Sequence, residues 1–229
     1  MNTFAVAQTG SAKEGFAPAG KKIEYADSIA AFAKADQASP PKTGGILFVG
    51  SSIFREWTRL GEQMAPLPVM NRAFGGARTW EVLHYADRIV FPYAPRVIVY
   101  YCGSNDINAG ETADAIAGRV RQFGERVAER LPDTKVYFVS SLRSPQKRDR
   151  WDVVDATNRM VREYATTTKN RDFIDANPLV FDKDGQPRME LYREDGLHYK
   201  DTFYRALATL IKPVLKEEWR SGVVSAKSK

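Results

Sequence analysis

The sequence contains very few cysteines and histidines. Its 229 residues include one cysteine, Cys102, and two histidines, His84 and His198. A single cysteine excludes an internal disulfide framework, and these three residues are too few for a zinc site built from thiolates and imidazoles. We therefore expect neither a disulfide nor a metal site, and we interpret Cys102 as a small buried hydrophobic residue.

Long hydrophobic runs are also missing. No segment approaches the ~20 consecutive apolar residues with which a helix crosses a bilayer, so we do not expect an integral membrane protein. No charged stretch followed by an apolar one marks an export leader. The letters AVA at residues 5–7 resemble the end of a cleaved export signal. Two locations stay open, the cytoplasm or export with the signal removed.

The sequence lacks the glycine-rich loops that cradle phosphates. Neither G-x-G-x-x-G nor G-x-x-x-x-G-K-[ST] follows the first apolar run, where a nucleotide- or flavin-binding doubly wound protein would carry it. The net charge is +6, but most basic residues alternate with acidic ones, as in RVRQFGERVAER, which is typical of a solvated helix face. We therefore expect no nucleotide cofactor and no nucleic-acid partner.

Short apolar runs alternate with helical patterns along most of the chain. The runs predict strands at residues 45–50, 67–71, 96–101, 135–140 and 171–176. Apolar residues at helical spacing predict helices at residues 23–38, 52–62, 79–89, 112–130, 152–168 and 200–219. This alternation predicts an α/β fold, in which helices cover both faces of a five-stranded parallel sheet.

The domain organisation is simple. We expect one folded domain over residues 23–220, without internal repeats or a long linker. Residues 1–22, rich in Ala, Gly and Ser, predict a flexible arm, and residues 221–229 predict a flexible tail.

Three polar, glycine-bearing loops follow the first three predicted strands. They are Ser51–Ser52, NRAFGGAR at residues 71–78 and CGSNDIN at residues 102–108. The carboxyl ends of parallel strands meet at one edge of a sheet, which is where ligands bind in this fold class. A serine at the start of a helix is most often only an N-cap. Because two further polar loops are expected at the same edge, the sequence favours a serine whose hydroxyl is a nucleophile at a helix N-terminus.

An ester-cleaving serine needs a base to take its proton. His84 lies inside a helical pattern, whereas His198 lies in a glycine-containing loop before the last helix. Asp195 precedes His198 by three residues, close enough to bond the imidazole Nδ1 and fix its tautomer. We therefore interpret Ser52, His198 and Asp195 as nucleophile, base and orienting acid.

The same loops offer donors for the oxyanion of an attacked ester. The backbone N–H of Ser52 stands at the helix start, and Asn105 offers a side-chain amide. A glycine of the FGGAR loop offers a second backbone N–H, because its missing side chain lets the substrate approach. Gly76 is the favoured donor and Gly75 the alternative. Asp106 is interpreted as a loop-holding residue.

Four motifs, in this order, carry a family resemblance: FVGSS, NRAFGGA, GSND and DGLH. They resemble the four blocks of the SGNH (GDSL-type) hydrolase superfamily, and the match extends over residues 46–213. The resemblance implies a three-layer αβα sandwich of flavodoxin-like topology. The sequence looks most similar to bacterial relatives of the platelet-activating-factor acetylhydrolase type.

The resemblance also implies roles for single residues. It implies Ser52 as nucleophile, His198 as base with Asp195 as its orienter, and Gly76 and Asn105 as oxyanion donors beside the Ser52 amide. The usual Gly-Asp-Ser of the family reads Gly-Ser-Ser here at residues 50–52. Residue 51 is therefore an alternative nucleophile, although the position of the glycine and of the helix start favours residue 52.

Candidate substrate-lining residues follow two of the strands. Arg78 and Trp80 come after the oxyanion glycine, and Arg143 and Trp151 begin and end the basic segment RSPQKRDRW. Its basic residues, which are Arg143, Lys147, Arg148 and Arg150, could meet a carboxylate, phosphate or sulfate on the substrate. A solvated basic loop is the alternative interpretation.

These observations predict a cofactor-free esterase or acylhydrolase that works through an acyl-enzyme on a small-molecule ester. A short acyl group, such as acetyl, is expected because no long apolar lid segment is visible. A non-catalytic module that binds carbohydrate or another small ligand, and an acyltransferase using the same residues, are the alternatives. The alcohol half of the ester and the oligomeric state stay open.

Overall fold

The computed structural model describes residues 17, 18 and 20–227. Its strands are β1 (Ile46–Gly50), β2 (Val69–Asn71), β3 (Val97–Tyr101), β4 (Lys135–Val139) and β5 (Arg171–Ile174). They form a five-stranded sheet in the order β2-β1-β3-β4-β5, and every neighbouring pair is parallel. The structure confirms the predicted α/β class, the parallel sheet and its strands.

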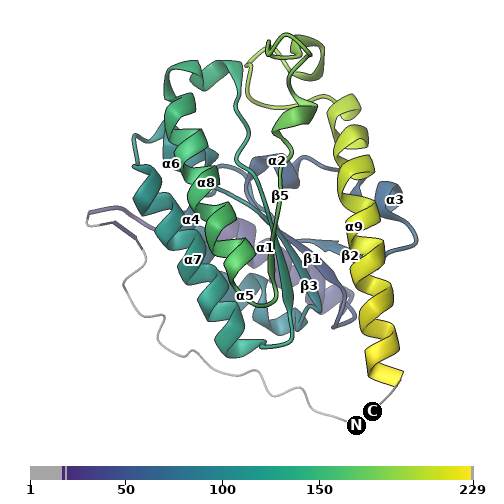
Figure 1. Cartoon of the computed structure of the whole chain (residues 1–229). Coiled ribbons are helices and arrows are strands. Elements are labelled where there is room, and N and C mark those ends of the chain that lie inside the picture. The colour runs from purple at the N-terminus through teal and green to yellow at the C-terminus, as the bar shows by residue number, and fades with distance from the viewer. Residues whose placement is uncertain (1–16, 19, 228–229) are drawn as a thin grey trace.

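Helices cover both faces of this sheet (Figure 1). They are α1 (Ala26–Ala38), α2 (Ser52–Arg55), α3 (Leu60–Met64), α4 (Thr79–His84), α5 (Ala86–Ile89), α6 (Ser104–Asn108), α7 (Ala113–Arg130), α8 (Trp151–Thr167) and α9 (Asp201–Lys227). Short 3₁₀ turns, η1 (Phe91–Tyr93), η2 (Pro145–Arg150), η3 (Asn177–Leu179) and η4 (Met189–Leu191), lie between them. The arrangement is the predicted three-layer sandwich.

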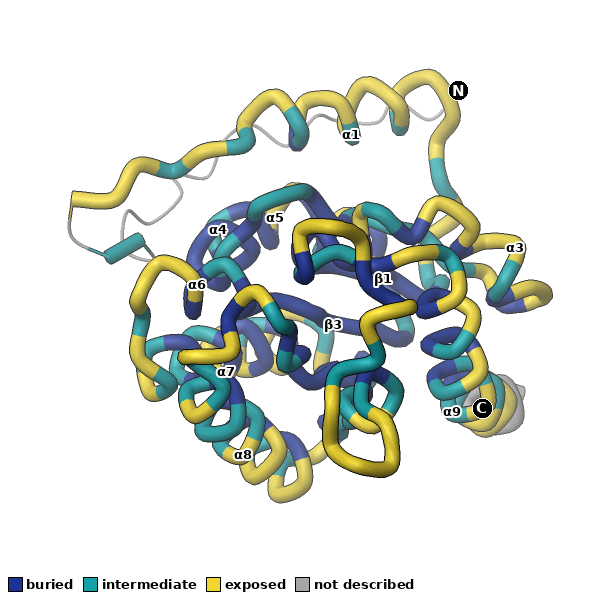
Figure 2. Tube along the Cα trace, turned by 90° about the horizontal axis from the view of Figure 1, so that it is seen from above, coloured by how far each residue is buried: buried dark blue, intermediate teal, exposed yellow. Residues whose placement is uncertain are grey.

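The two faces of the sheet carry separate hydrophobic cores. Successive side chains of a strand point to opposite faces, so Ile46 and Phe48 of β1 pack against α2, α3 and α9. Leu47 and Val49 pack on the other side, against α1, α4, α5, α7 and α8. Figure 2 shows β1 and β3 buried between these layers, while α1 lies outermost with an exposed face.

The predicted helix over residues 52–62 is wrong. It is two short helices, α2 and α3, separated by a turn after Glu56. The turn brings Trp57 into the core, where its ring contacts Phe48, Phe54 and Tyr204. The indole is 2% exposed in this arrangement, so tertiary packing overrides the local helical pattern here.

The remaining boundaries differ less. The predicted helix 79–89 is interrupted at Tyr85, between α4 and α5, and α1 begins only after Tyr25, whose φ is +69°. Helix α9 continues to Lys227, so the predicted tail is helical from residue 221 to residue 227. The predicted arm falls mostly on residues 1–16 and 19, outside the described residues. No helix in the described ranges is both long and apolar enough to cross a membrane.

The chain makes an unusually close approach where β1 ends. Gly50 has a φ of +142°, and a Cβ at this position would lie 1.8 Å from the carbonyl oxygen of Tyr101 on β3. Only glycine fits there, both in backbone conformation and in space. The next residue, Ser51, donates its N–H to the same Tyr101 oxygen over 3.0 Å. The turn that precedes Ser52 is thereby tied to the neighbouring strand.

Replacement of Gly50 by alanine should strongly destabilise the protein. The added methyl group has to displace the β3 backbone, and we expect the free energy of unfolding to fall by about 3–5 kcal/mol. Urea denaturation of the purified variant measures this. Gly61→Ala is the matched control, because Gly61 lies in α3 with nothing within 4 Å of its added Cβ. The control should leave stability unchanged or raise it by up to about 1 kcal/mol, and equal effects would contradict the argument.

Candidate active site

Three of the predicted residues meet at the carboxyl edge of the sheet. Ser52 is the first residue of α2, directly after the turn that follows β1. Its Oγ lies 3.0 Å from Nε2 of His198, a residue 146 positions away in the sequence. The Nδ1 of the same ring lies 2.6 Å from Oδ2 of Asp195. A serine, an imidazole and a carboxylate are thus hydrogen-bonded in series.

The loop before α9 fixes the imidazole. Asp195 Oδ1 accepts the backbone N–H groups of Leu197 and His198, each over 2.9 Å. Burial alone would raise the pKa of Asp195, but the hydrogen bonds from the His198 ring and from these two N–H groups outweigh it and lower the pKa to about 2. The carboxylate is therefore ionised at neutral pH, and it orients the ring with Nε2 toward Ser52.

The two adjacent serines have different surroundings. Ser51 is 1% exposed, and its Oγ is buried without a hydrogen-bond partner among the described residues. Ser52 is 8% exposed and is the serine bonded to the imidazole. Of the two alternatives left open by the sequence, only Ser52 has the base beside it.

The glycines of the second loop are closely covered. Gly76 has a φ of +76°, and a Cβ there would lie 2.4 Å from the hydroxyl of Tyr25. A Cβ on Gly75 would lie 2.7 Å from Nε of Arg55. At Gly75 the half-exposed Arg55 side chain could shift aside, whereas Gly76 also has a conformation that favours glycine. The choice of the Gly76 amide as oxyanion donor stays a prediction.

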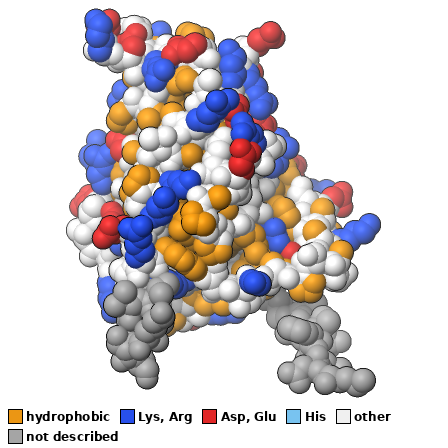
Figure 3. Space-filling model, turned by 90° about the vertical axis from the view of Figure 1, so that its right-hand side faces the viewer, with side chains coloured by type: hydrophobic (Ala, Val, Ile, Leu, Met, Phe, Trp, Pro, Cys, Tyr) orange, Lys and Arg blue, Asp and Glu red, His pale blue; other side chains and the backbone are white. Residues whose placement is uncertain are grey.

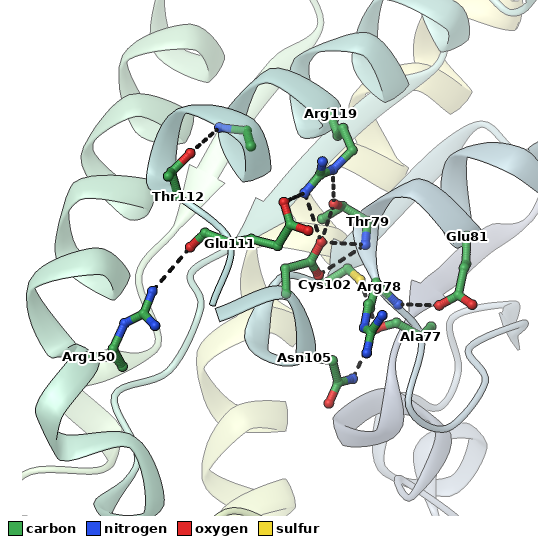
Figure 4. A network of polar contacts seen from close by, with 12 residues as sticks. Ala77, Arg78, Thr79, Glu81, Cys102, Asn105, Glu111, Thr112, Arg119 and Arg150 are labelled. Atoms are coloured by element: carbon green, nitrogen blue, oxygen red, sulfur yellow. Dashed lines mark hydrogen bonds and ion pairs between the residues drawn. The ribbon is translucent and has the colours of Figure 1, made fainter. Parts of the chain in front are cut away.

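Polar contacts brace the second and third loops against each other (Figure 4). Asn105 donates from Nδ2 to the carbonyl of Ala77 over 3.0 Å. Its neighbour Asp106 is fully buried and accepts the N–H of Thr79 on both carboxylate oxygens and the Thr79 hydroxyl on one. Arg119 of α7 lies 3.3 Å from Asp106 and supplies the opposite charge. Burial raises the pKa of Asp106, and the Thr79 bonds and Arg119 offset part of that rise. Asp106 therefore holds two loops together, rather than only its own.

Lys147 is not part of a solvated loop. It is 2% exposed, and its ammonium donates to Oγ of Ser104 over 2.7 Å and to Oγ of Ser144 over 3.1 Å. The expectation that it meets a substrate anion is wrong, because its side chain points into the protein.

The η2 turn that carries Lys147 also touches the histidine loop, since Gln146 donates its N–H to the carbonyl of Gly196 over 3.2 Å. The η2 turn thus joins the start of α6, beside Asn105, to the loop that carries His198.

The predicted substrate-lining residues Arg78, which precedes α4, and Trp80, which lies in it, differ in burial. Trp80 is fully buried, so it does not line an open cleft. Its ring centre lies 4.8 Å from the guanidinium carbon of Arg78 and 5.3 Å from that of Arg119. The α4 helix turns the indole into the core layer, a direction that the spacing after Gly76 did not reveal. Arg78 is half-buried beside the Asn105–Ala77 contact and stays a candidate.

Arg143 and Trp151 pack against each other instead of standing free. The Arg143 guanidinium donates to Asp155 through Nε over 2.7 Å and lies 5.7 Å from the Trp151 ring centre. Trp151 donates from Nε1 to the carbonyl of Ser144 over 2.9 Å. Their role in substrate binding stays a prediction.

Two residues near the site were not predicted. Glu56 places Oε1 3.9 Å from Nε2 of His198, and Tyr25 covers Gly76 with its hydroxyl. A signal existed for Glu56, which follows Ser52 by four residues and so shares its helix face. No local signal marks Tyr25, because it precedes α1 and reaches the site only through the fold.

An apolar hollow lies at the opposite end of the strands. Its lining includes Ile46, Val69, Met70, Tyr93 and Trp219. In Figure 3 hydrophobic side chains gather in the lower half of the face that carries α3 and α9, while basic and acidic ones are interspersed above. This hollow is separate from the rim that holds Ser52.

The Ser–His–Asp series has the arrangement that serine hydrolases carry on several unrelated folds. The sequence profile of the GDSL-like lipase/acylhydrolase family matches residues 27–206. The chain belongs to this family.

Individual relatives are similar over most of their length. The alpha1 subunit of human platelet-activating factor acetylhydrolase IB is 26% identical over 194 residues, which are 80% of this chain and 82% of that protein. The structure of a proposed acylhydrolase from Bacteroides fragilis superposes with a TM-score of 0.73 at 19% identity, covering 85% of this chain and 99% of that one. A carbohydrate esterase of family 3 from Talaromyces cellulolyticus has a TM-score of 0.61 at 18% identity, covering 76% and 97%.

Burial of Lys147 should make stability rise with pH in an alkaline window. Desolvation lowers the pKa of its ammonium from 10.5 to about 8, so the unfolded chain binds the extra proton between these values. Folding stability from this group therefore increases as the pH rises from 8 to 10.5, by up to about 3 kcal/mol. The measurement is urea denaturation of the wild type and of Lys147→Met across this range. The stability difference between them should grow in favour of the wild type, and a flat or falling difference would contradict the burial cost.

Proposed function

We propose that the protein is a serine esterase in which Ser52 attacks the ester, His198 acts as general base and Asp195 orients it. The observation that carries the proposal is the 3.0 Å contact between Ser52 Oγ and His198 Nε2, with Asp195 2.6 Å from the other ring nitrogen. These distances allow direct proton transfer from the hydroxyl to the imidazole. Membership in an acylhydrolase family supports the same reaction class.

The reaction proceeds in two stages. Ser52 Oγ bonds to the ester carbonyl carbon while its proton passes to His198 Nε2, and the carbonyl oxygen becomes an oxyanion. The intermediate collapses, and His198 gives the proton to the leaving alcohol, which leaves an acyl-serine. Water then attacks the acyl carbon and gives a proton to His198. The second intermediate collapses by breaking the bond to Ser52 Oγ, which takes the proton back from His198 as the carboxylic acid leaves.

The oxyanion needs preorganised donors. The N–H groups of Ser52 and Gly76 and the side-chain amide of Asn105 take this role in the proposal. One amide hydrogen of Asn105 is used by the Ala77 carbonyl, which fixes the side chain and leaves the second hydrogen for the substrate. A donor held in this way loses no reorganisation energy during the reaction.

The substrate proposed is a small-molecule ester with a short acyl group, such as acetyl. Relatives named as an acetylhydrolase and as a carbohydrate esterase support this choice, as does the lack of a long apolar segment that could form a lid over an acyl chain. The alcohol half is a sugar, a lipid headgroup or another small alcohol.

Removal of the Ser52 hydroxyl should abolish turnover. With p-nitrophenyl acetate the wild type should release a burst of p-nitrophenol followed by steady turnover, and Ser52→Ala should lower kcat by about 10⁴-fold or more. A fluorophosphonate probe should label the wild type and not the variant. Ser51→Ala is the matched control and should keep both labelling and rate. Rates like those of the wild type in Ser52→Ala would refute the mechanism, and failure of the wild type to react would favour a binding module.

Activity should fall as the acyl chain lengthens. Across p-nitrophenyl acetate, butyrate and octanoate, we expect kcat/KM to be highest for acetate and to fall by roughly tenfold or more at octanoate, a loss of about 1.4 kcal/mol in transition-state binding. Acetylated sugars assayed beside these esters report on the alcohol half. A preference for octanoate would contradict the short-acyl proposal while leaving the esterase intact.

A further inference from the structure

A second carboxylate lies beside the imidazole, on the side away from Asp195. Glu56 donates its backbone N–H to the carbonyl of Ser52 over 2.8 Å, so the two residues belong to one helical turn. Its Oε1 is 3.9 Å from His198 Nε2, the nitrogen that faces the Ser52 hydroxyl. The side chains of Glu56 and His198 are only 13% and 22% exposed, so solvent screens their interaction weakly.

Two arginines hold this carboxylate in place. Arg55 Nη2 lies 2.9 Å from Oε1, and Arg193 Nη1 lies 2.9 Å from Oε2. Arg193 is itself tied to the histidine loop, because its N–H donates to the carbonyl of His198 over 2.8 Å and its Nε to that of Tyr199 over 3.0 Å. Both arginine side chains are about half exposed, at 52% and 50%, so water screens their charges more than it screens that of Glu56.

We propose that Glu56 is a positioning residue that stabilises the positive charge on His198 when the imidazole takes the Ser52 proton. The inference rests on the proposed esterase function and adds to it a residue outside the Ser–His–Asp set. When Nε2 gains the proton, Asp195 faces one ring nitrogen and Glu56 the other. The separation of 3.9 Å is too long for a hydrogen bond, so Glu56 acts through its charge and not as a second base.

The other groups around the ring do not supply this charge. Arg55 and Arg193 are positive and oppose protonation of the imidazole. Tyr204, which packs against Trp57, has its pKa raised mainly by burial and also by Glu56, so its phenol is neutral. Asp195 is engaged with Nδ1. Glu56 is thus the negative group on the Nε2 side among the described residues.

The test compares Glu56→Gln with Glu62→Gln. Glu62 is an exposed glutamate on α3 that pairs with Arg59, so its variant loses the same charge away from the site. The ring signals of His198 are followed against pH by NMR in proteins that also carry His84→Gln, which leaves a single imidazole. We expect Glu56→Gln to lower the pH of half-protonation of the His198 ring by about one unit, and Glu62→Gln to leave it unchanged.

Kinetics provide the second measurement. On p-nitrophenyl acetate, Glu56→Gln should lower kcat on the pH plateau roughly three- to tenfold, with KM little changed and the acid limb moved in step with the NMR midpoint. Glu56→Asp, which keeps the charge, should recover most of both effects.

Each outcome decides the inference. An NMR midpoint in Glu56→Gln within about 0.2 units of that in Glu62→Gln overturns it whatever the rate, because the loss of rate is then structural. A midpoint that falls while kcat stays within twofold of the wild type overturns the catalytic role. If the wild type hydrolyses no ester, the proposed function fails, and the midpoint alone decides whether Glu56 stabilises the charged ring.

Discussion

The close contact between the backbone of Gly50 and the carbonyl of Tyr101 is the constraint on which the site depends. It allows β1 to turn sharply at its carboxyl end, and Ser51 and Phe74 then bond their N–H groups to Tyr101 and Gly50 across the sheet edge. The first three loops are thereby locked to one another by backbone atoms. Ser52 emerges from this junction with its direction already set, which is what an attacking hydroxyl requires.

Buried polar groups then hold the surrounding loops at some cost in stability. Burial removes the Asp106 carboxylate from water, and its contacts with Thr79 and Arg119 offset only part of that cost. The raised pKa of Asp106 reflects the part that is not offset. Lys147 is a stronger case, because hydroxyl groups of Ser104 and Ser144 are its hydrogen-bond partners and its pKa falls to about 8. Asp106 adjoins Asn105, and Lys147 adjoins Gln146, whose N–H bonds the carbonyl of Gly196 in the histidine loop. These buried contacts lower the stability of the folded state, but they hold Asn105 and the histidine loop in one fixed arrangement.

Much of this arrangement was predictable from local patterns. The strands and the parallel sheet follow from short apolar runs separated by helical ones, and they are confirmed. The meeting of Ser52, His198 and Asp195 follows from motif order and from the rule that the ends of parallel strands share one edge. The failures are equally specific. The pattern over residues 52–62 reads as one helix, yet Trp57 is buried by a turn that splits it into α2 and α3. Trp80 and Lys147, placed at the surface by their neighbours in sequence, are buried by contacts with distant elements.

Local sequence therefore established the class of fold, the turn that carries Ser52 and the pairing of His198 with Asp195, because these depend on periodicity and on residues only a few positions apart. The folded chain established which side chains lie near them. Arg193 and Tyr25 come from segments that no local pattern links to the site. Glu56 lies four residues after Ser52, but its distance from His198 also depends on how the helices pack across the sheet. Burial, charge environment and distances between segments are properties of that packing, and a linear pattern carries no record of them.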